Sequence, residues 1–294
     1  MKKPVSRILL ACALLWPTAL WADYMDGYRA SFHGDYAAAL RIWRPLAEQG
    51  DRCAQFSVGY AYVEGQGISR DYQEAFKWFG KAAEQGLLAA QTNLGIMYRD
   101  GRGVPKDQAK GIALLRQAAE AGEGVAQHAL GVSYLEGRGV EKNERNGVLW
   151  KLKSANQGYI YAQHDLGWLY AHGVGVRQDY TQAARWYREA ADRGLWQSQA
   201  NLARLYLRGN GVPKDNFAGY IWLRLAIAGS PSPPTKLVEL RKELEAQQSA
   251  RTREDAEIVI ENWHPTPRRR ISSFDDLVIK QCAPAQVKEI ERVQ

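Results

Sequence analysis

The chain has 294 residues, of which 46% are hydrophobic and 24% charged, a composition typical of a soluble globular protein. Its formal net charge of +7 is mild and does not favour a nucleic-acid-binding protein, a class that needs a concentrated basic face. Ten Trp and fifteen Tyr are many for this length, so we expect them in packing or on a binding face.

Residues 1–22 predict a secretory signal peptide. Lys2, Lys3 and Arg7 precede a short apolar segment, and Ala22 precedes the expected cleavage bond. The apolar stretch 8–22 is shorter than the roughly 20 residues that a membrane-spanning helix needs. An anchor or a buried helix is the alternative, and lipid attachment at Cys12 has weaker support. We therefore expect an exported chain, periplasmic or secreted, without stable membrane insertion and with a net charge of +4 once the signal is removed.

Residues 23–50 predict a degenerate capping repeat. Asp35, Ala39 and Gly50 lie 36 residues before equivalent residues of the next segment, but the Gly-x-Gly loop of the later segments is missing. The first and last units of a repeat array need a polar outer face, which explains a divergent first unit.

Residues 51–230 contain a pattern that recurs every 36 residues without insertion. The stretch LGIMYRDGRGVPKD, which starts at Leu94, has counterparts that start at residues 58, 130, 166 and 202. Each copy carries a Tyr, two loop glycines and an Asp or Asn. The tyrosines are Tyr62, Tyr98, Tyr134, Tyr170 and Tyr206, and the glycine pairs are Gly65/Gly67, Gly101/Gly103, Gly137/Gly139, Gly173/Gly175 and Gly209/Gly211. Self-similarity at a fixed period predicts a repeat array.

Each unit is predicted to form two helices joined by the glycine loop. The first helix ends at the first loop glycine, because glycine adopts the left-handed conformation of a helix C-terminus without strain. The second begins after a predicted N-cap, which is Asp71, Asp107, Asn143, Asp179 or Asp215. Glu74 and Gln182, three residues later, predict a reciprocal capping box in two units. Small residues inside both helices, such as Gly95 and Gly111, predict close approach of the two backbones.

The C-terminal part is predicted to comprise two capping helices and a tail. The capping region spans residues 231–263, with helices at 236–248 and 253–263, and the polar tail spans 264–294. We expect the tail to be poorly ordered or to form one short docked helix. Its stretch PRRRISS, from Pro267 to Ser273, is predicted to be solvated rather than a contact for an acidic partner, phospholipid or nucleic acid.

Cys53 and Cys282 remain after the signal peptide is removed. Two cysteines in an oxidising compartment can pair, but their separation of 229 residues gives no local support for a disulfide. The sequence leaves the pairing open.

Catalysis and cofactor binding find little support. A loop that recurs five times is predicted to be architecture, and the Gly-x-Gly loops lack the further residues of a dinucleotide or P-loop motif. His128 and His164 share one repeat position and can lie near each other, but Asp165 is the only evident further metal ligand. Stacked surface histidines are the favoured interpretation. We expect no enzyme activity, no cofactor and no metal.

The full repeat pattern resembles the Sel1-like repeat, a 36-residue relative of the tetratricopeptide repeat. The resemblance covers five consecutive units from about residue 51 to 230 and is densest at 160–194, with departures such as Gly111, Leu114 and Ala203. It implies an all-α fold, a right-handed α-solenoid of helix-loop-helix repeats. It also implies an adaptor or scaffold for protein complexes, often in the bacterial envelope, and no common catalytic residues.

A partner is expected on the concave face, which the first helices of such repeats line. In each unit we assign to this face the positions equivalent to 53, 57, 60 and 64, which share one side of the helix. The predicted partner-binding residues are Tyr60, Asn93, Ile96, Asp100, Val132, Tyr161, Asp165, Trp168, Asn201, Arg204 and Arg208. Contacts between neighbouring first helices, or a groove filled by the chain's own tail, are the alternatives.

These residues predict an exported bacterial adaptor that binds a protein or peptide partner. The face carries acidic residues in its first three units and Arg204 and Arg208 in the fifth. An extended segment with an acidic group near these two arginines would fit it. The alternative is an envelope scaffold for polysaccharide or peptidoglycan machinery, in which Trp and Tyr rings contact sugars. The sequence does not identify the partner.

Overall fold

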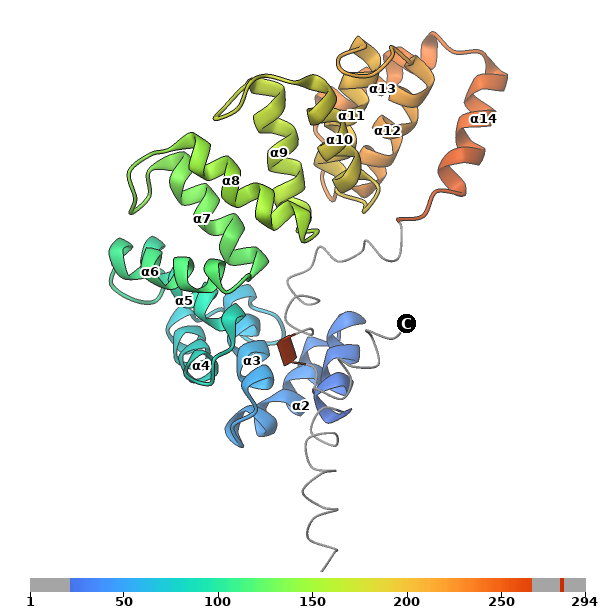
Figure 1. Cartoon of the computed structure of the whole chain (residues 1–294). Helices are drawn as coiled ribbons and strands as arrows, with labels where there is room; N and C mark the ends of the chain where they lie inside the picture. Colours follow the sequence, from blue (N-terminus) through green and yellow to red (C-terminus); the bar gives the residue numbers. More distant parts are fainter. Residues whose placement is uncertain (1–21, 266–280, 283–294) are drawn as a thin grey trace, which may run out of the picture. The chain divides into compact units, whose positions relative to one another are not determined.

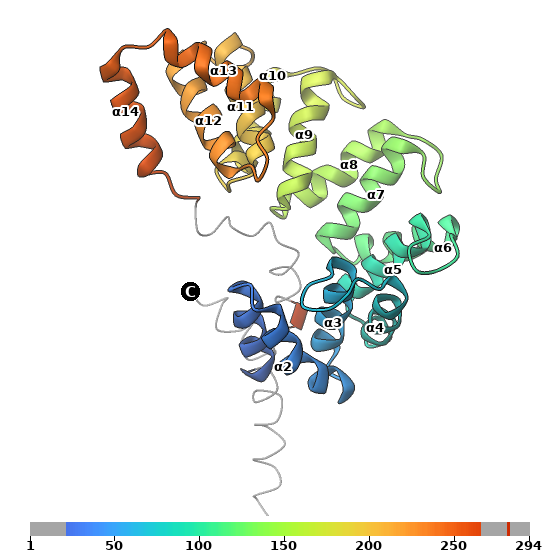
Figure 2. The same cartoon turned by 180° about the vertical axis from the view of Figure 1, so that it is seen from behind.

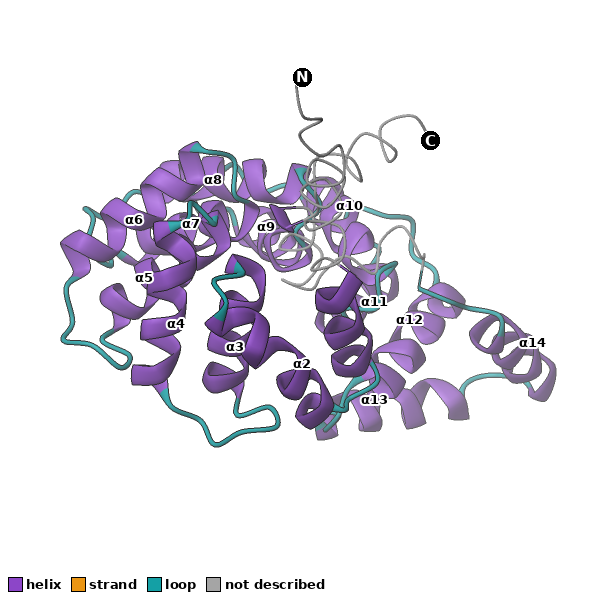
Figure 3. Cartoon of the chain, turned by 90° about the horizontal axis from the view of Figure 1, so that it is seen from below, coloured by secondary structure: helices purple, strands orange, loops and turns teal. Residues whose placement is uncertain are grey.

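The computed structural model describes residues 22–265 and 281–282, and this part of the chain forms helices and loops without a strand (Figure 3). The predicted signal peptide, except Ala22, and most of the predicted tail lie outside the described residues. Among the helices that the structure describes, none is both long enough and apolar enough to cross a membrane. The chain divides into two compact units, Met1–Ala121 with Asp275–Gln294, and Gly122–Phe274.

The first unit contains the predicted N-terminal cap and the first two repeats (Figure 1). Residues 22–32 are helical, and Tyr24 within them is buried against Trp43, so the cap has two helices although its loop is short. The following helices are α2 (Tyr36–Glu48), α3 (Arg52–Glu64), α4 (Tyr72–Glu84), α5 (Leu88–Asp100) and α6 (Gln108–Glu120). Helices α3 and α4 form one pair, and α5 and α6 form the next.

The second unit contains the other three repeats and the C-terminal helices (Figure 2). Its pairs are α7 (Gly124–Glu136) with α8 (Glu144–Asn156), α9 (Ile160–His172) with α10 (Tyr180–Ala191), and α11 (Trp196–Arg208) with α12 (Asn216–Gly229). The predicted capping helices are α13 (Thr235–Ala246) and α14 (Ala250–Glu261), and both pack against α12. The structure thus has two helices in the segment that follows residue 230.

The glycine loop and the N-caps form as predicted, but the capping box does not. The first loop glycine ends each first helix with φ near +70°, as at Gly101, where φ is 75°. The Asp107 carboxylate accepts a hydrogen bond from the backbone N–H of Lys110, and the four equivalent caps behave alike. The cap's own N–H, which a capping box would satisfy through Glu74 or Gln182, instead donates to the carbonyl of the repeat tyrosine. In the second repeat the Asp107 N–H lies 2.8 Å from the Tyr98 oxygen.

The small residues bring the two helices of a repeat into backbone contact. A Cβ added to Gly111 would lie 2.7 Å from the carbonyl oxygen of Gly95 and 2.6 Å from the nitrogen of Arg99. The second loop glycine serves a different contact, since a Cβ on Gly103 would lie 2.5 Å from the backbone of Tyr72 at the start of α4. Side chains at these positions would therefore collide with backbone atoms rather than with movable side chains.

A buried glutamine, which the sequence analysis did not single out, joins successive helix pairs within each unit. The amide of Gln55 donates to the carbonyl of Ala47 at the end of α2 at 3.1 Å, and Gln163 and Gln199 do the same for α8 and α10. These bonds satisfy carbonyls that the ends of α-helices leave without partners.

Candidate functional site

We use the name first-helix face for the four positions per repeat that the sequence analysis assigned to partner binding. Trp168 and Tyr161 are 45% and 47% exposed, and Arg204 and Arg208 are exposed as well. The other predicted residues are half-buried: Tyr60, Asn93, Ile96, Asp100, Val132, Asp165 and Asn201. All eleven predicted residues therefore keep some solvent-accessible surface.

In the first unit, residues 281 and 282 of the chain itself lie on this face. Cys53 and Cys282 form a disulfide with a Cα–Cα distance of 5.9 Å. The backbone N–H of Ala89 donates to the side-chain oxygen of Gln281 at 3.2 Å, and the Arg52 guanidinium donates to the Gln281 carbonyl at 3.3 Å. Cys53 and Ala89 are equivalent positions of two repeats. The pairing that the sequence left open exists. Residues 281–282, which are helical, lie beside α3 (Figure 1).

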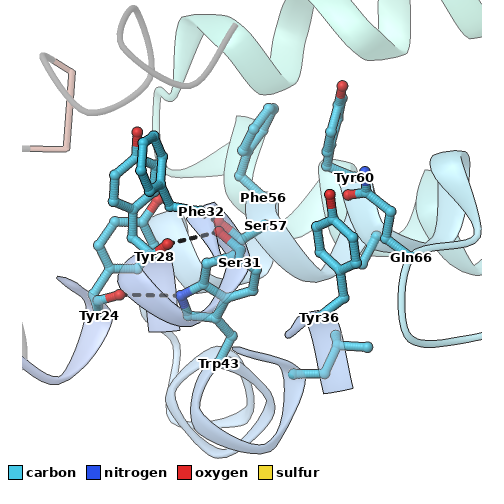
Figure 4. A pocket seen from close by; sticks show the side chains of 12 residues that line it. Tyr24, Tyr28, Ser31, Phe32, Tyr36, Trp43, Phe56, Ser57, Tyr60 and Gln66 are labelled. Atoms are coloured by element: carbon cyan, nitrogen blue, oxygen red, sulfur yellow. Dashed lines mark hydrogen bonds between the residues drawn. The ribbon is translucent and has the colours of Figure 1, made fainter. Parts of the chain in front are cut away.

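The first unit also contains an aromatic pocket of about 140 Å³ between residues 22–32, α2 and α3. Figure 4 shows Tyr28 and Phe32 on one side of it and Tyr36 and Tyr60 on the other. The indole N–H of Trp43 donates to the carbonyl of Tyr24 at 3.1 Å, which fixes the ring below the pocket. Of the predicted residues, Tyr60 lines this pocket.

In the second unit, a larger pocket of about 590 Å³ opens between α7, α8 and α9. Three predicted residues, Val132, Asp165 and Trp168, line it together. Its other lining residues are Leu135, Glu136, Lys142, Glu144, Lys151, His164, Leu169 and Val174. The volume falls within the range of about 300–1,000 Å³ typical of ligand pockets.

The polar centre of this pocket is an ion pair that the sequence analysis missed. Lys151 comes from α8, its side chain is 2% exposed, and its ammonium donates to the Asp165 carboxylate of α9. The same carboxylate oxygen accepts a hydrogen bond from His128 Nε2 on α7 at 2.9 Å. The repeat register could have revealed Lys151, because a lysine there is an exception. The other units carry apolar or aromatic residues at this position, namely Phe79, Leu115, Tyr187 and Leu223.

Burial and neighbouring charges shift the pKa values of Asp165 and Lys151 in opposite directions. Burial alone would raise the pKa of the Asp165 carboxyl, but the hydrogen bond from His128 and the charge of Lys151 outweigh it and hold this pKa well below its usual range. Burial lowers the pKa of the Lys151 ammonium, and the Asp165 charge opposes that shift. Burial likewise lowers the pKa of His164, which favours its neutral form.

The prediction of stacked surface histidines is wrong. The His128 side chain is 19% exposed and binds Asp165, while His164 is half-buried and its Nδ1 lies 2.8 Å from the Ser198 hydroxyl oxygen. Each histidine bonds to the next first helix, which draws its ring inward. Within the part of the chain that the structure describes, no cluster of three or more His, Cys, Asp or Glu side chains is suited to a metal ion.

The pairing of Ser198 with His164 does not form a catalytic dyad. Ser198 is fully buried, so a substrate cannot reach its hydroxyl. The neighbouring Asp165 carboxylate bonds to His128 and Lys151, whereas a triad needs a carboxylate on the second nitrogen of the base. The arrangement joins two helices.

Two of the remaining predicted residues, Asn93 and Asn201, form side-chain hydrogen bonds within their own helices. The Asn93 amide donates to the Ala89 carbonyl at 2.8 Å, and the Asn201 side-chain oxygen accepts from Arg204 at 3.1 Å. Asp100 lies against Arg99, and its side chain is 16% exposed. Val132, Asp165 and Trp168 are therefore the predicted residues that share one pocket, and all three belong to the second unit.

A series of 36-residue helix pairs with a glycine loop and an Asp or Asn cap defines an all-α solenoid of the repeat-scaffold class. The Sel1 repeat family matches residues 54–87, 88–123, 124–159, 160–195 and 196–230. The chain belongs to the Sel1 repeat proteins. Sel1 repeats generally serve protein–protein interaction.

Solved structures support this assignment. A Sel1 repeat protein from Oxalobacter formigenes is 30% identical, with a TM-score of 0.57 and coverage of 71% of this chain and 83% of that chain. A protective antigen of uropathogenic Escherichia coli strains, c5321, is 29% identical, with a TM-score of 0.58 and coverage of 89% of this chain and 62% of that one. The immunity protein Pa5087 from Pseudomonas aeruginosa shares the fold at 22% identity, with a TM-score of 0.51 and coverage of 78% and 81%. Comparison with curated proteins gave no match.

Proposed function

We propose that this protein is an exported bacterial adaptor that binds a protein or peptide partner through the first-helix face. One observation carries the proposal: the face already holds a peptide segment, because Gln281 and Cys282 dock on it through a disulfide and two hydrogen bonds. The second unit presents its own pocket on the same face, with Trp168 and Asp165 in its lining.

Two features support export. The sequence begins with a predicted signal peptide, and disulfides persist mainly in oxidising compartments such as the periplasm or the extracellular space. Binding rather than catalysis is supported by the family, whose repeats act as scaffolds, and by the burial of Ser198, which excludes the Ser198–His164 pair as a nucleophile.

The test is affinity capture from an envelope extract of the source bacterium, with the oxidised wild-type protein and three variants as bait. Trp168→Ala and Arg204→Glu alter the first-helix face, while Leu149→Ala removes a side chain of similar exposure on α8 and is the matched control. We expect wild type and Leu149→Ala to retain the same protein, and both face variants to lose it. Unchanged recovery with both face variants removes this face from the proposal. Recovery of glycan in place of protein favours the polysaccharide scaffold.

A further inference from the structure

The interior of the second-unit pocket offers one donor and one acceptor side by side. Lys151 has three ammonium protons, and the described residues supply one acceptor for them, Oδ2 of Asp165. The other carboxylate oxygen of Asp165 has no hydrogen-bond donor within the described part of the chain. Both residues line the pocket, and the Lys151 side chain is almost entirely buried. A ligand that both accepts and donates would complete this pair.

The charges in the pocket disfavour a charged ligand group. Lys151 and Asp165 cancel each other, and the inner His164 is neutral because burial lowers its pKa. The other charged residues of the lining are also paired: Lys142 lies 2.9 Å from Glu144, and Glu136 pairs with Arg138. A ligand carboxylate would meet Asp165 and a ligand ammonium would meet Lys151, so each would lose hydration without a net Coulombic gain. A neutral group that carries both a carbonyl oxygen and N–H donors avoids this cost and satisfies both partners.

The wall of the pocket suits an aliphatic stem. Val132, Leu135 and the half-exposed ring of Trp168 line it, and Trp168 is held by stacking on His172 at a ring-centroid distance of 4.3 Å. The chain itself supplies a precedent for the headgroup, because the carboxamide oxygen of Gln281 accepts the Ala89 N–H on the same face in the first unit.

We propose that the pocket between α7, α8 and α9 recognises a glutamine or asparagine side chain of the partner. The carboxamide oxygen accepts from Lys151, its amide donates to Asp165, and its methylene stem lies against Trp168 and Val132. This proposal rests on the proposed function, since it names the residue type that the adaptor selects in its partner.

The test is a random-peptide display selection against the oxidised full-length mature protein. Selected peptides are then resynthesised with Gln, Asn, Glu, Lys or Leu at each position, and binding is measured by fluorescence anisotropy. We expect one position to require Gln or Asn, with Glu, Lys and Leu each lowering affinity at least tenfold. Lys151→Leu introduces the residue type that two other repeats carry at this position, as Leu115 and Leu223. It should also lower affinity at least tenfold. Asp165→Asn tests the acceptor without loss of volume, and Leu149→Ala should bind as wild type.

The outcomes separate the two proposals. Peptides that lose affinity with Trp168→Ala but prefer an acidic, basic or apolar anchor overturn the carboxamide assignment and leave the adaptor function standing. Peptides that bind Trp168→Ala, Lys151→Leu and wild type equally overturn the pocket as the site, and failure to select any peptide counts against peptide binding itself.

Discussion

Lys151 lies at a position that the other repeats fill with apolar or aromatic side chains. A buried lysine at this position lowers the stability of the fold. A buried ion pair loses hydration that its mutual attraction repays only in part, so a hydrophobic pair of similar volume is often more stable. Lys151 contacts Gly131 as Leu115 contacts Gly95, which shows that an apolar residue fits the same space. A repeat that retains lysine there gives up stability for a polar pocket, as functional sites often do.

The first prediction concerns this exchange of stability. Lys151→Leu combined with Asp165→Asn uses residue types that other repeats carry at these two positions, and it should raise the free energy of unfolding by about 1–4 kcal/mol. Asp165→Ala alone leaves the buried ammonium without its counter-ion and should lower it by about 3 kcal/mol. Urea denaturation followed by circular dichroism measures both. Equal destabilisation by the single and the double change would contradict the ion-pair account.

The second prediction follows from His164. Its pKa in the folded state lies below the value of about 6.5 expected in the unfolded chain, mainly because of burial. The unfolded state therefore binds more protons once the pH falls below about 6.5, and the stability contributed by the neutral ring declines on acidification. In His164→Asn, which keeps a polar atom near Ser198, the melting temperature should fall less between pH 7 and pH 5. A parallel decline in both proteins would show that His164 does not contribute.

At the scale of the helix pair, glycine has opposite consequences at two positions. A Cβ on Gly95 meets the Gly111 carbonyl oxygen at 3.0 Å and Leu115 at 2.9 Å, whereas a Cβ on Gly80 in α4 meets no atom within 4 Å. Gly95 therefore permits the close contact of α5 with α6, while Gly80 only adds freedom to the unfolded chain.

The third prediction uses this contrast. Gly95→Leu should separate α5 from α6 and abolish the cooperative unfolding transition, and Gly80→Ala should stabilise the protein by about 0.5–1 kcal/mol. Thermal melts recorded by circular dichroism compare the two variants with wild type. An unchanged melting temperature for Gly95→Leu would show that the helices tolerate a larger separation.

The repeated N-cap illustrates how an element uses more than its local motif. The carbonyl of the repeat tyrosine in the first helix accepts a hydrogen bond from the backbone N–H of the cap residue, which holds the two ends of the loop together. The glutamate of the expected capping box, Glu74, pairs instead with Lys77 at 2.5 Å. Local sequence correctly predicts the cap residue, but the competing acceptor belongs to the preceding helix.

At the scale of the whole molecule, the Cys53–Cys282 disulfide closes a loop of 229 residues that contains every repeat after Cys53. Such a closure lowers the entropy of the unfolded chain, and the native contribution of a disulfide is typically about 2–4 kcal/mol. It also tethers a peptide segment to the first-helix face.

The fourth prediction is that Cys282→Ser lowers the unfolding free energy by about 2–4 kcal/mol. The same loss should appear when wild type is treated with a reductant, and reductant should add no further loss in Cys282→Ser. Chemical denaturation with and without dithiothreitol measures these values, and thiol labelling confirms the oxidised state. A reductant effect that persists in Cys282→Ser would place it elsewhere.

The sequence by itself determined the repeat length, the helix boundaries near each glycine loop and the five N-caps. These features depend on local chemistry: left-handed glycine at Gly101 and a side-chain oxygen at Asp107 act within a few residues of their own positions. Because the 36-residue pattern occurs in five copies, each of these assignments is supported by five equivalent positions.

Only the tertiary structure decided which distant or differently placed residues meet. Cys53 joins Cys282 although nothing local links them, and Lys151 meets Asp165 because α8 and α9 pack with these two positions facing each other. His128 and His164 are drawn inward by bonds to neighbouring helices that their shared repeat position did not reveal. Side-chain pairing across helices depends on packing distance and burial, which periodicity does not encode. The polar centre of the candidate site therefore emerged from the folded chain.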